Sequence, residues 1–289
     1  MSAVQPQIVQ QAVGDTELTY LAYDGNGPPV LFLHAAGFMP WLWHPIAREI
    51  VPDYRVIAPC LYDHRSADPA AGGLPWELLA ADVVTLCHER HIERPYLVGH
   101  SMGAVIAAIA HVHFRLAVRG MVLLEPIFLA EHIYSHAVTV HDHPLAAQAL
   151  TRTNFWRDES DAMSYLNSRN LFTHWDREML SLYVRHGMTR GSWGGLQLAC
   201  PPEQEAALFM GGVHFDPWPL LPRVTCPVLL LEGETSDTRQ FIDFPRAVSL
   251  IPDCIHRLVP QAGHLIPMER PTAVATLIRQ FLARAGRNT

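Results

Sequence analysis

The sequence lacks the features that mark several large classes of protein. It has no Cys-x-x-Cys pair, and its five cysteines lie far apart in mostly apolar surroundings. We therefore expect small buried thiols in a reducing compartment, and no cysteine-built zinc or redox centre. The sequence contains the pairs His111-x-His113 and His141-x-His143. With 17 histidines in the chain, such pairs are expected by chance. No metal site is predicted.

Positive charge and long apolar runs are also scarce. The chain has 21 Lys and Arg against 28 Asp and Glu, a formal net charge of -7, and no basic stripe, which argues against a nucleic acid partner. No apolar stretch approaches the roughly 20 residues that span a bilayer, and the N-terminus MSAVQPQIVQQ does not resemble a secretion signal. We expect a soluble, cytoplasmic protein that binds no membrane.

Short apolar runs bounded by turn residues recur along the 289 residues, of which 49% are hydrophobic. Runs without polar alternation are typical of strands buried on both faces, as in a parallel sheet. The runs are Val30 to Leu33, Arg55 to Leu61, Tyr96 to Val98, Met121 to Leu124, Val228 to Leu231 and Arg257 to Val259.

Segments with helical character alternate with these runs, at residues 76–91, 101–114 and 271–284. The alternation predicts an α/β fold with a mostly parallel sheet flanked by helices. Near the N-terminus, residues 8–13 and 17–23 flank Gly14-Asp15, which predicts an antiparallel hairpin at the edge of the sheet.

The alternation stops between about Pro126 and Arg223. This stretch has no strand run but many aromatic residues, and residues 159–166 and 176–186 have helical spacing. We expect residues 1–126 and 224–289 to form the α/β core, and residues 127–223 to form a helical cap inserted between two strands.

The stretch LVGHSMGAVIA, residues 97–107, places Ser101 between Gly99 and Gly103, directly after an apolar run. A strand that ends here and a helix that starts at the serine leave almost no connection, so the backbone must turn sharply. The glycines permit this turn. The serine would then present its oxygen at a helix N-terminus, where free N–H groups stabilise an oxyanion.

A serine hydroxyl needs a base at neutral pH, and the base needs an acid to orient it. In QAGHLIPMERP, His264 follows Gly263 in a short loop between a strand and the final helix, and it is the predicted base. His256 lies inside a strand and His100 is a sequence neighbour of the serine, so both are worse placed.

Four acids are candidates for the orienting carboxylate. The run ending at Leu231 opens into EGETSDTR, which offers Asp237 as first choice, Glu234 as second, and also Glu232. Glu125, at the end of the run Met121 to Leu124, is a further candidate, although a place in the floor of a substrate pocket is the favoured expectation for it.

With GHSMG and AGHLIPMERP in the order serine, acid, histidine, the chain resembles the α/β-hydrolase superfamily. The resemblance spans about residues 18–125 and 220–285. It implies that GHSMG is the nucleophile elbow and that two backbone N–H groups, of Ala36 and Met102, form the oxyanion hole. Two stretches differ from the usual pattern of the superfamily. In LFLHAAGF, Ala35 stands where a glycine usually follows the histidine, here His34. The stretch CLYDHRSADP stands where many members have the glycine-rich sequence R-G-H-G-x-S.

The predicted function is a serine hydrolase that forms an acyl-enzyme on Ser101 with a small, ester-like, largely apolar substrate and without a cofactor. His34, Glu125, Trp156 and Phe172 are candidate substrate contacts, although aromatics at helical spacing more often form the interior of such a segment. Carbon–carbon bond hydrolases, thioesterases and lactonases of this superfamily remain alternatives, as does a binding protein with little turnover.

Overall fold

The computed structural model describes residues 4–287. Within these residues, an eight-stranded sheet has the order β1-β2-β4-β3-β5-β6-β9-β10. The strands are β1 (Gln7–Val13), β2 (Thr16–Tyr23), β3 (Pro29–Leu33), β4 (Arg55–Pro59), β5 (Tyr96–His100), β6 (Gly120–Leu124), β9 (Val228–Gly233) and β10 (Cys254–Val259). From β4 to β10 all neighbours pair in parallel, so the predicted α/β class is confirmed.

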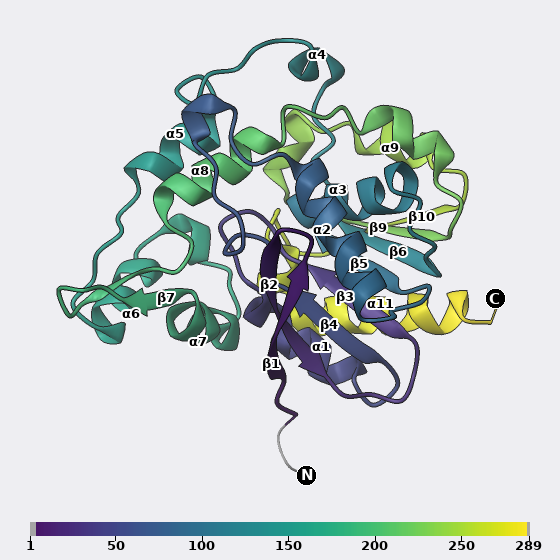
Figure 1. The fold of residues 1–289 in the computed structure, drawn as a ribbon, viewed down its shortest axis with the longest axis horizontal. Helices are drawn as coiled ribbons and strands as arrows, with labels where there is room; N and C mark the ends of the chain where they lie inside the picture. The colour runs from purple at the N-terminus through teal and green to yellow at the C-terminus, as the bar shows by residue number, and fades with distance from the viewer. Residues whose placement is uncertain (1–3, 288–289) are drawn as a thin grey trace.

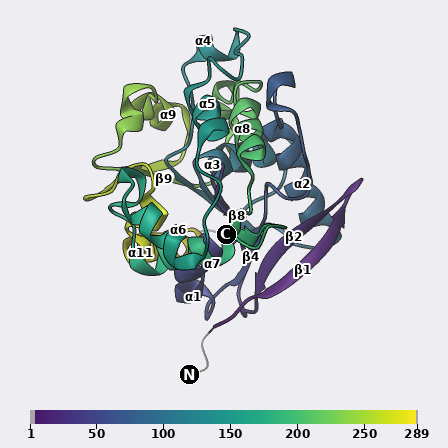
Figure 2. The same cartoon turned by 90° about the vertical axis from the view of Figure 1, so that its left-hand side faces the viewer.

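The central strands are apolar because both of their faces are covered. Every residue of β3, β5, β6 and β9 is buried, which explains why the sequence showed no polar alternation there. The hairpin prediction is also confirmed, since β1 pairs antiparallel with β2 from Gln7 opposite Ala22 to Val13 opposite Thr16. Figure 2 shows this hairpin at the edge of the molecule.

Helices connect the strands and cover the sheet, with α1 packed on α11 and α2 on α3. Figure 2 places α2 and α11 on opposite sides of the molecule. In the core the helices are α1 (His44–Ile50), α2 (Trp76–Glu89), α3 (Met102–Ala108), α9 (Phe244–Leu250), α10 (Ile266–Glu269) and α11 (Pro271–Ala285), and a π-helical stretch, η3 (Ile109–His113), extends α3. The short 3-10 turns in the core are η1 (Pro40–Trp43), η2 (Pro69–Ala71) and η6 (Asp237–Gln240), while η5 (Trp218–Arg223) ends the inserted segment. No helix within residues 4–287 has the length and apolarity needed to cross a bilayer.

The inserted segment, residues 127–223, leaves the sheet after β6 and returns before β9. Figure 1 shows most of its helices gathered to one side of the sheet. They are α4 (Glu131–Tyr134), α5 (Pro144–Thr151), α6 (Glu159–Asn167), α7 (Arg177–His186), α8 (Pro202–Gly211) and the 3-10 turn η4 (Asn170–Phe172).

One expectation for the inserted segment is corrected. It was predicted to contain no strand, but β7 (Met188–Arg190) and β8 (Leu196–Leu198) pair antiparallel in a small separate sheet. Each strand has three residues, which is too short to leave a recognisable alternation in the sequence.

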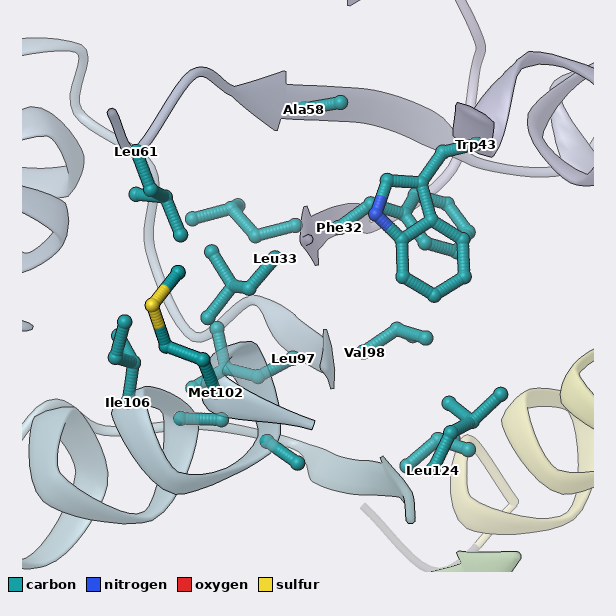
Figure 3. Packing of buried hydrophobic residues seen from close by; sticks show 14 of the residues in the cluster. Phe32, Leu33, Trp43, Ala58, Leu61, Leu97, Val98, Met102, Ile106 and Leu124 are labelled. Carbon is teal, nitrogen blue, oxygen red and sulfur yellow. The ribbon is translucent and has the colours of Figure 1, made fainter. Parts of the chain in front are cut away.

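A continuous apolar cluster fills the space between the sheet and its helices. Figure 3 shows Met102 of α3 pointing into this cluster together with Leu33 of β3 and Ile106. The cluster extends into the inserted segment, where Trp156 and Met179 are also among its buried members. The first turn of α3 is therefore anchored in the apolar core through Met102.

Candidate active site

Ser101 is the single residue between β5 and α3, and it has a backbone φ of 55° and ψ of -114°. A non-glycine residue in this region is strained and is held there only by its surroundings. The flanking glycines leave room for the turn, as predicted. A Cβ at Gly99 would lie 2.5 Å from the backbone nitrogen of Ala104, and one at Gly103 would lie 2.6 Å from the carbonyl carbon of Leu33.

The predicted base lies against this serine. His264 follows β10 and precedes α10, and its Nε2 is 3.1 Å from Oγ of Ser101. The hydroxyl can donate to this nitrogen when the imidazole is neutral. The serine is 8% exposed, while the His264 side chain is 23% exposed, so the pair lies just beneath the surface.

Glu125 holds the other ring nitrogen of His264. Its Oε2 is 3.1 Å from Nδ1, and its side chain is fully buried. The carboxylate also accepts from the backbone N–H of Gly233 at 2.6 Å and from the hydroxyls of Ser236 at 2.8 Å and Thr238 at 2.6 Å. A buried charge is tolerated when it is hydrogen-bonded in this way.

The expectation that Asp237 would contact His264 is therefore corrected, because Glu125 occupies that position. Asp237 is exposed and begins the 3-10 turn η6. Its neighbours Ser236 and Thr238 point inward to Glu125, and this leaves the side chain between them facing outward. The loop after β9 thus supplies hydrogen-bond donors to the carboxylate and does not supply the carboxylate itself.

The remaining acid candidates have other partners. Glu232 accepts a hydrogen bond from Nε of Arg239 at 2.5 Å and pairs with Nε2 of His256 at 2.8 Å. Glu234 accepts from the backbone N–H of Gln261 at 2.9 Å. His256 is thereby occupied on the outer strand β10, away from the serine, in agreement with its rejection as the base.

The two residues predicted to form the oxyanion hole belong to different elements. Met102 is the first residue of α3, where the N–H of a helix has no acceptor within the helix. Ala36 is buried in the loop after β3. A Cβ at Gly103 would also lie 2.8 Å from the carbonyl oxygen of His34, so this loop begins in direct contact with the first turn of α3.

These residues lie within the region matched by the model of the Alpha/beta hydrolase family, which covers residues 30–277. The chain belongs to this family. The hydrolase is 24% identical to Esterase YbfF of Escherichia coli (strain K12) over 263 residues, which are 89% of this chain and 94% of that protein. It is also 24% identical, over 260 residues, to 2-(acetamidomethylene)succinate hydrolase of Mesorhizobium japonicum, with 89% of each chain covered.

Solved structures with low sequence identity share the fold of the hydrolase. The crystal structure of E-2-(acetamidomethylene)succinate hydrolase has a TM-score of 0.81 at 20% identity and covers 96% of this chain and 100% of that one. A malate-bound thermophilic esterase from Thermogutta terrifontis has a TM-score of 0.72 at 23% identity, with 96% and 99% covered. These likenesses extend over the sheet and the inserted segment alike.

His34, expected among the substrate contacts, is tied to the backbone of the hydrolase through both ring nitrogens. Nε2 accepts from the N–H of Leu61 at 2.8 Å, so Nδ1 carries the proton and donates to the carbonyl of Ala35 at 2.8 Å. Burial lowers the pKa of His34 to about 4, which keeps the ring neutral at pH 7. Its visible role is to join the loop after β3 to the chain after β4.

His100 was rejected as a base, but it has a place in the site that sequence reasoning missed. Its Nε2 donates to the carbonyl oxygen of His264 at 2.9 Å, and the two rings are 5.2 Å apart. Burial lowers the pKa of His100 to about 3, so this donor does not change charge near neutral pH. The residue before the serine thus fixes the backbone of the histidine loop.

The two aromatic candidates lie in the packed interior of the inserted segment. Trp156 is 2% exposed and pairs through its backbone with Leu196, and Phe172 is 6% exposed and packs on Trp175 and Tyr183. This burial agrees with the interior role that aromatics at helical spacing usually have. Their contact with a substrate stays a prediction.

The stability of the hydrolase is expected to depend on pH through Glu125. Burial by itself would raise the pKa of this carboxyl, but hydrogen bonds from His264, Thr238 and Gly233 outweigh it and leave the pKa below the ordinary 4.5. A group whose pKa is lowered on folding stabilises the fold above its unfolded pKa. That contribution is lost as the pH falls through the folded pKa.

Glu125→Gln removes the ionisable group and tests this dependence. The free energy of unfolding of the variant should fall short of the wild-type value most clearly above about pH 5. The shortfall should shrink as the pH drops below 4.5. Urea unfolding at pH 7 and at pH 4 measures it. A shortfall that is constant or larger in acid contradicts the lowered pKa.

Proposed function

We propose that this hydrolase cleaves a carboxylic ester, or a related acyl compound, of a small and largely apolar substrate through an acyl-enzyme on Ser101. The observation that carries the proposal is the hydrogen-bonded chain from Ser101 Oγ through His264 to Glu125. In this chain a hydroxyl, an imidazole and a carboxylate stand in the order that activates a serine nucleophile.

In the first half of the reaction, Oγ of Ser101 attacks the carbonyl carbon while its proton passes to Nε2 of His264. Glu125 stabilises the imidazolium through Nδ1. The carbonyl oxygen becomes an oxyanion, which the N–H groups of Ala36 and Met102 stabilise. When the tetrahedral intermediate collapses, the imidazolium gives its proton to the departing alcohol, and the acyl group stays on Ser101.

In the second half, water replaces the alcohol. Its proton passes to Nε2 of His264 as its oxygen attacks the acyl carbon, and the same N–H groups stabilise the second oxyanion. Collapse returns the proton to Oγ of Ser101 and releases the acid. The chain itself supplies the nucleophile, the base and the charge stabilisation, so neither half needs a cofactor.

The aromatic rings packed against Phe38, in the loop after β3, support an apolar substrate. Phe38, two residues after Ala36, packs on Trp175 at 5.6 Å and on Tyr183 at 6.0 Å between ring centroids. Both partners belong to the inserted segment, which begins directly after Glu125 and its neighbour Pro126. We propose that residues 127–223 act as a cap over the serine, with residues 1–126 and 224–289 as the core.

A serine at the elbow supports acyl transfer over the related chemistry in which an aspartate forms an alkyl-enzyme. Among the relatives, one is named an esterase and another a hydrolase of 2-(acetamidomethylene)succinate. We propose ester cleavage because Ser101, His264 and Glu125 together supply the nucleophile, the base and the orienting carboxylate that this reaction needs.

A panel of p-nitrophenyl esters with acyl chains from two to eight carbons tests the proposal. We expect turnover with a pre-steady-state burst of p-nitrophenol whose amplitude matches the concentration of active protein. Thioesters and a vinylogous diketone are assayed in parallel with the esters. Turnover of the diketone alone would replace ester cleavage with carbon–carbon bond hydrolysis, and no turnover with any compound would favour a binding protein.

A further inference from the structure

An ion pair between half-buried Arg152 and buried Glu205 of the inserted segment lies against the loop after β3. Arg152, which follows α5, donates to Oε2 of Glu205 in the first turn of α8, and also to the hydroxyl of Tyr183 in α7 at 3.3 Å. The side chains of Arg152 and Glu205 are 22% and 11% exposed. Burying both charges costs solvation free energy, so such a pair is weak evidence for a purely stabilising role.

The same carboxylate contacts Gly37. A Cβ added at Gly37 would lie 2.7 Å from Cδ of Glu205 and closer still to Oε1. Gly37 has a φ of +74° and lies in the turn closed by the hydrogen bond from the N–H of Phe38 to the carbonyl of Ala35, at 3.2 Å. The backbone angle therefore requires glycine here. A larger side chain would in addition displace the carboxylate of Glu205.

This turn, residues 35–38, is held from two sides. On the core side, the ring of His34 joins it to Leu61. On the side of the inserted segment, Glu205 covers Gly37, and the ring of Phe38 packs on Trp175 and Tyr183. Tyr183 takes part in both contacts, since its hydroxyl accepts from Arg152. Figure 1 shows that α8, which carries Glu205, lies beside α5, which ends just before Arg152.

We infer that Arg152 and Glu205 are positioning residues that fix the turn 35–38, so that the N–H of Ala36 points at the oxyanion formed on a substrate. The inference rests on the proposed function. The inserted segment then does more than cover the serine, because its ion pair completes the oxyanion hole. An oxyanion donor acts only within a narrow distance range, and a displacement of about 1 Å can cost up to about 100-fold in rate.

Glu205→Gln tests the inference, with Glu178→Gln as a matched control. Glu178 of α7 pairs with Arg48 of α1 at 2.5 and 2.7 Å, so it also joins the inserted segment to the core, but at a more exposed place outside the turn 35–38. With the best ester, Glu205→Gln should lower kcat about 10- to 100-fold and leave KM within about 3-fold. Glu178→Gln should leave both within about 2-fold.

A second measurement separates a displaced turn from a partly unfolded protein. Active sites are counted from the p-nitrophenol burst, and rates are expressed per active site. The inhibition constant of a trifluoromethyl ketone, which forms an oxyanion on the serine, should rise in parallel with the loss of kcat. The inhibition constant of the corresponding alcohol, which forms none, should change little.

Equal kcat values per active site for Glu205→Gln and Glu178→Gln would overturn the inference, as would a raised KM with unchanged kcat. If Glu205→Gln does not fold, Tyr183→Phe takes its place. It removes only the hydroxyl that accepts from Arg152, and it should lower kcat about 3- to 10-fold at constant KM. Unchanged kcat in that variant overturns the inference. A wild-type protein without ester turnover overturns the proposed function itself.

Discussion

Replacing Ser101 with alanine is expected to lower kcat for the best ester by up to about 10⁶-fold, toward the residual rate that the oxyanion donors and substrate binding supply. The reason is that the acyl-enzyme can no longer form. Water would have to attack directly, without a positioned hydroxyl 3.1 Å from Nε2 of His264. Steady-state kinetics and the loss of the p-nitrophenol burst measure the effect.

Ser168→Ala is a suitable control, because this exposed serine follows α6 and donates only to the nearby carbonyl of Tyr165. Its kinetics should equal those of the wild type. Mass spectrometry after brief incubation with the ester should find the acyl adduct on wild type and control, and none on Ser101→Ala. Near-normal turnover by the alanine variant would refute the assignment of the nucleophile.

Glu125→Gln is expected to lower kcat by about 10⁴-fold, while Asp237→Asn should stay within about 2-fold of the wild type. The carboxylate of Glu125 fixes the proton of His264 on Nδ1 and stabilises the imidazolium that forms when Nε2 takes the serine proton. A glutamine of the same shape can present its amide N–H to Nδ1, which favours the wrong tautomer and carries no negative charge.

Asp237→Asn is the matched control, because Asp237 is exposed but lies between Ser236 and Thr238, whose hydroxyls bind Glu125. Thermal unfolding should be followed for both variants, so that kinetics are compared only for folded protein. If Asp237→Asn abolishes hydrolysis and Glu125→Gln leaves it intact, then the contact between Glu125 and His264 is not the catalytic one.

Much of the sheet was predictable because its signal is local. Strands buried on both faces need apolar side chains at every position, so β3, β5, β6 and β9 are visible as short apolar runs. The hairpin β1-β2 was predicted by a turn between two short runs. The helices α5 and α8 were not predicted, because their burial depends largely on contact with each other.

Ser101 and the histidine in contact with it were predictable for the same reason. The tight turn at Ser101 needs a glycine two residues away on either side. The five consecutive residues 99–103 therefore show the turn in the sequence. His264 stands out as a polar residue in a short loop after a strand. Neither argument requires knowledge of which segments meet in space, although only the structure gives the 3.1 Å between them.

The choice of the acid was different. Glu125 and Asp237 both follow strands of the parallel sheet, and β6 and β9 are neighbours in it, so either loop lies near His264. What separates them is the direction of each side chain. Ser236 and Thr238 turn inward to bind the carboxylate of Glu125, which forces Asp237 outward.

By itself, then, the sequence determined the α/β class, the turn at Ser101 and the histidine that faces it, because each is imposed by residues that are neighbours in the chain. Only the tertiary structure decided that Glu125 orients His264, that His100 holds the histidine loop, and that Glu205 covers Gly37. These contacts join residues 139 to 168 positions apart. Such partners replace water only when the distant segments have packed together.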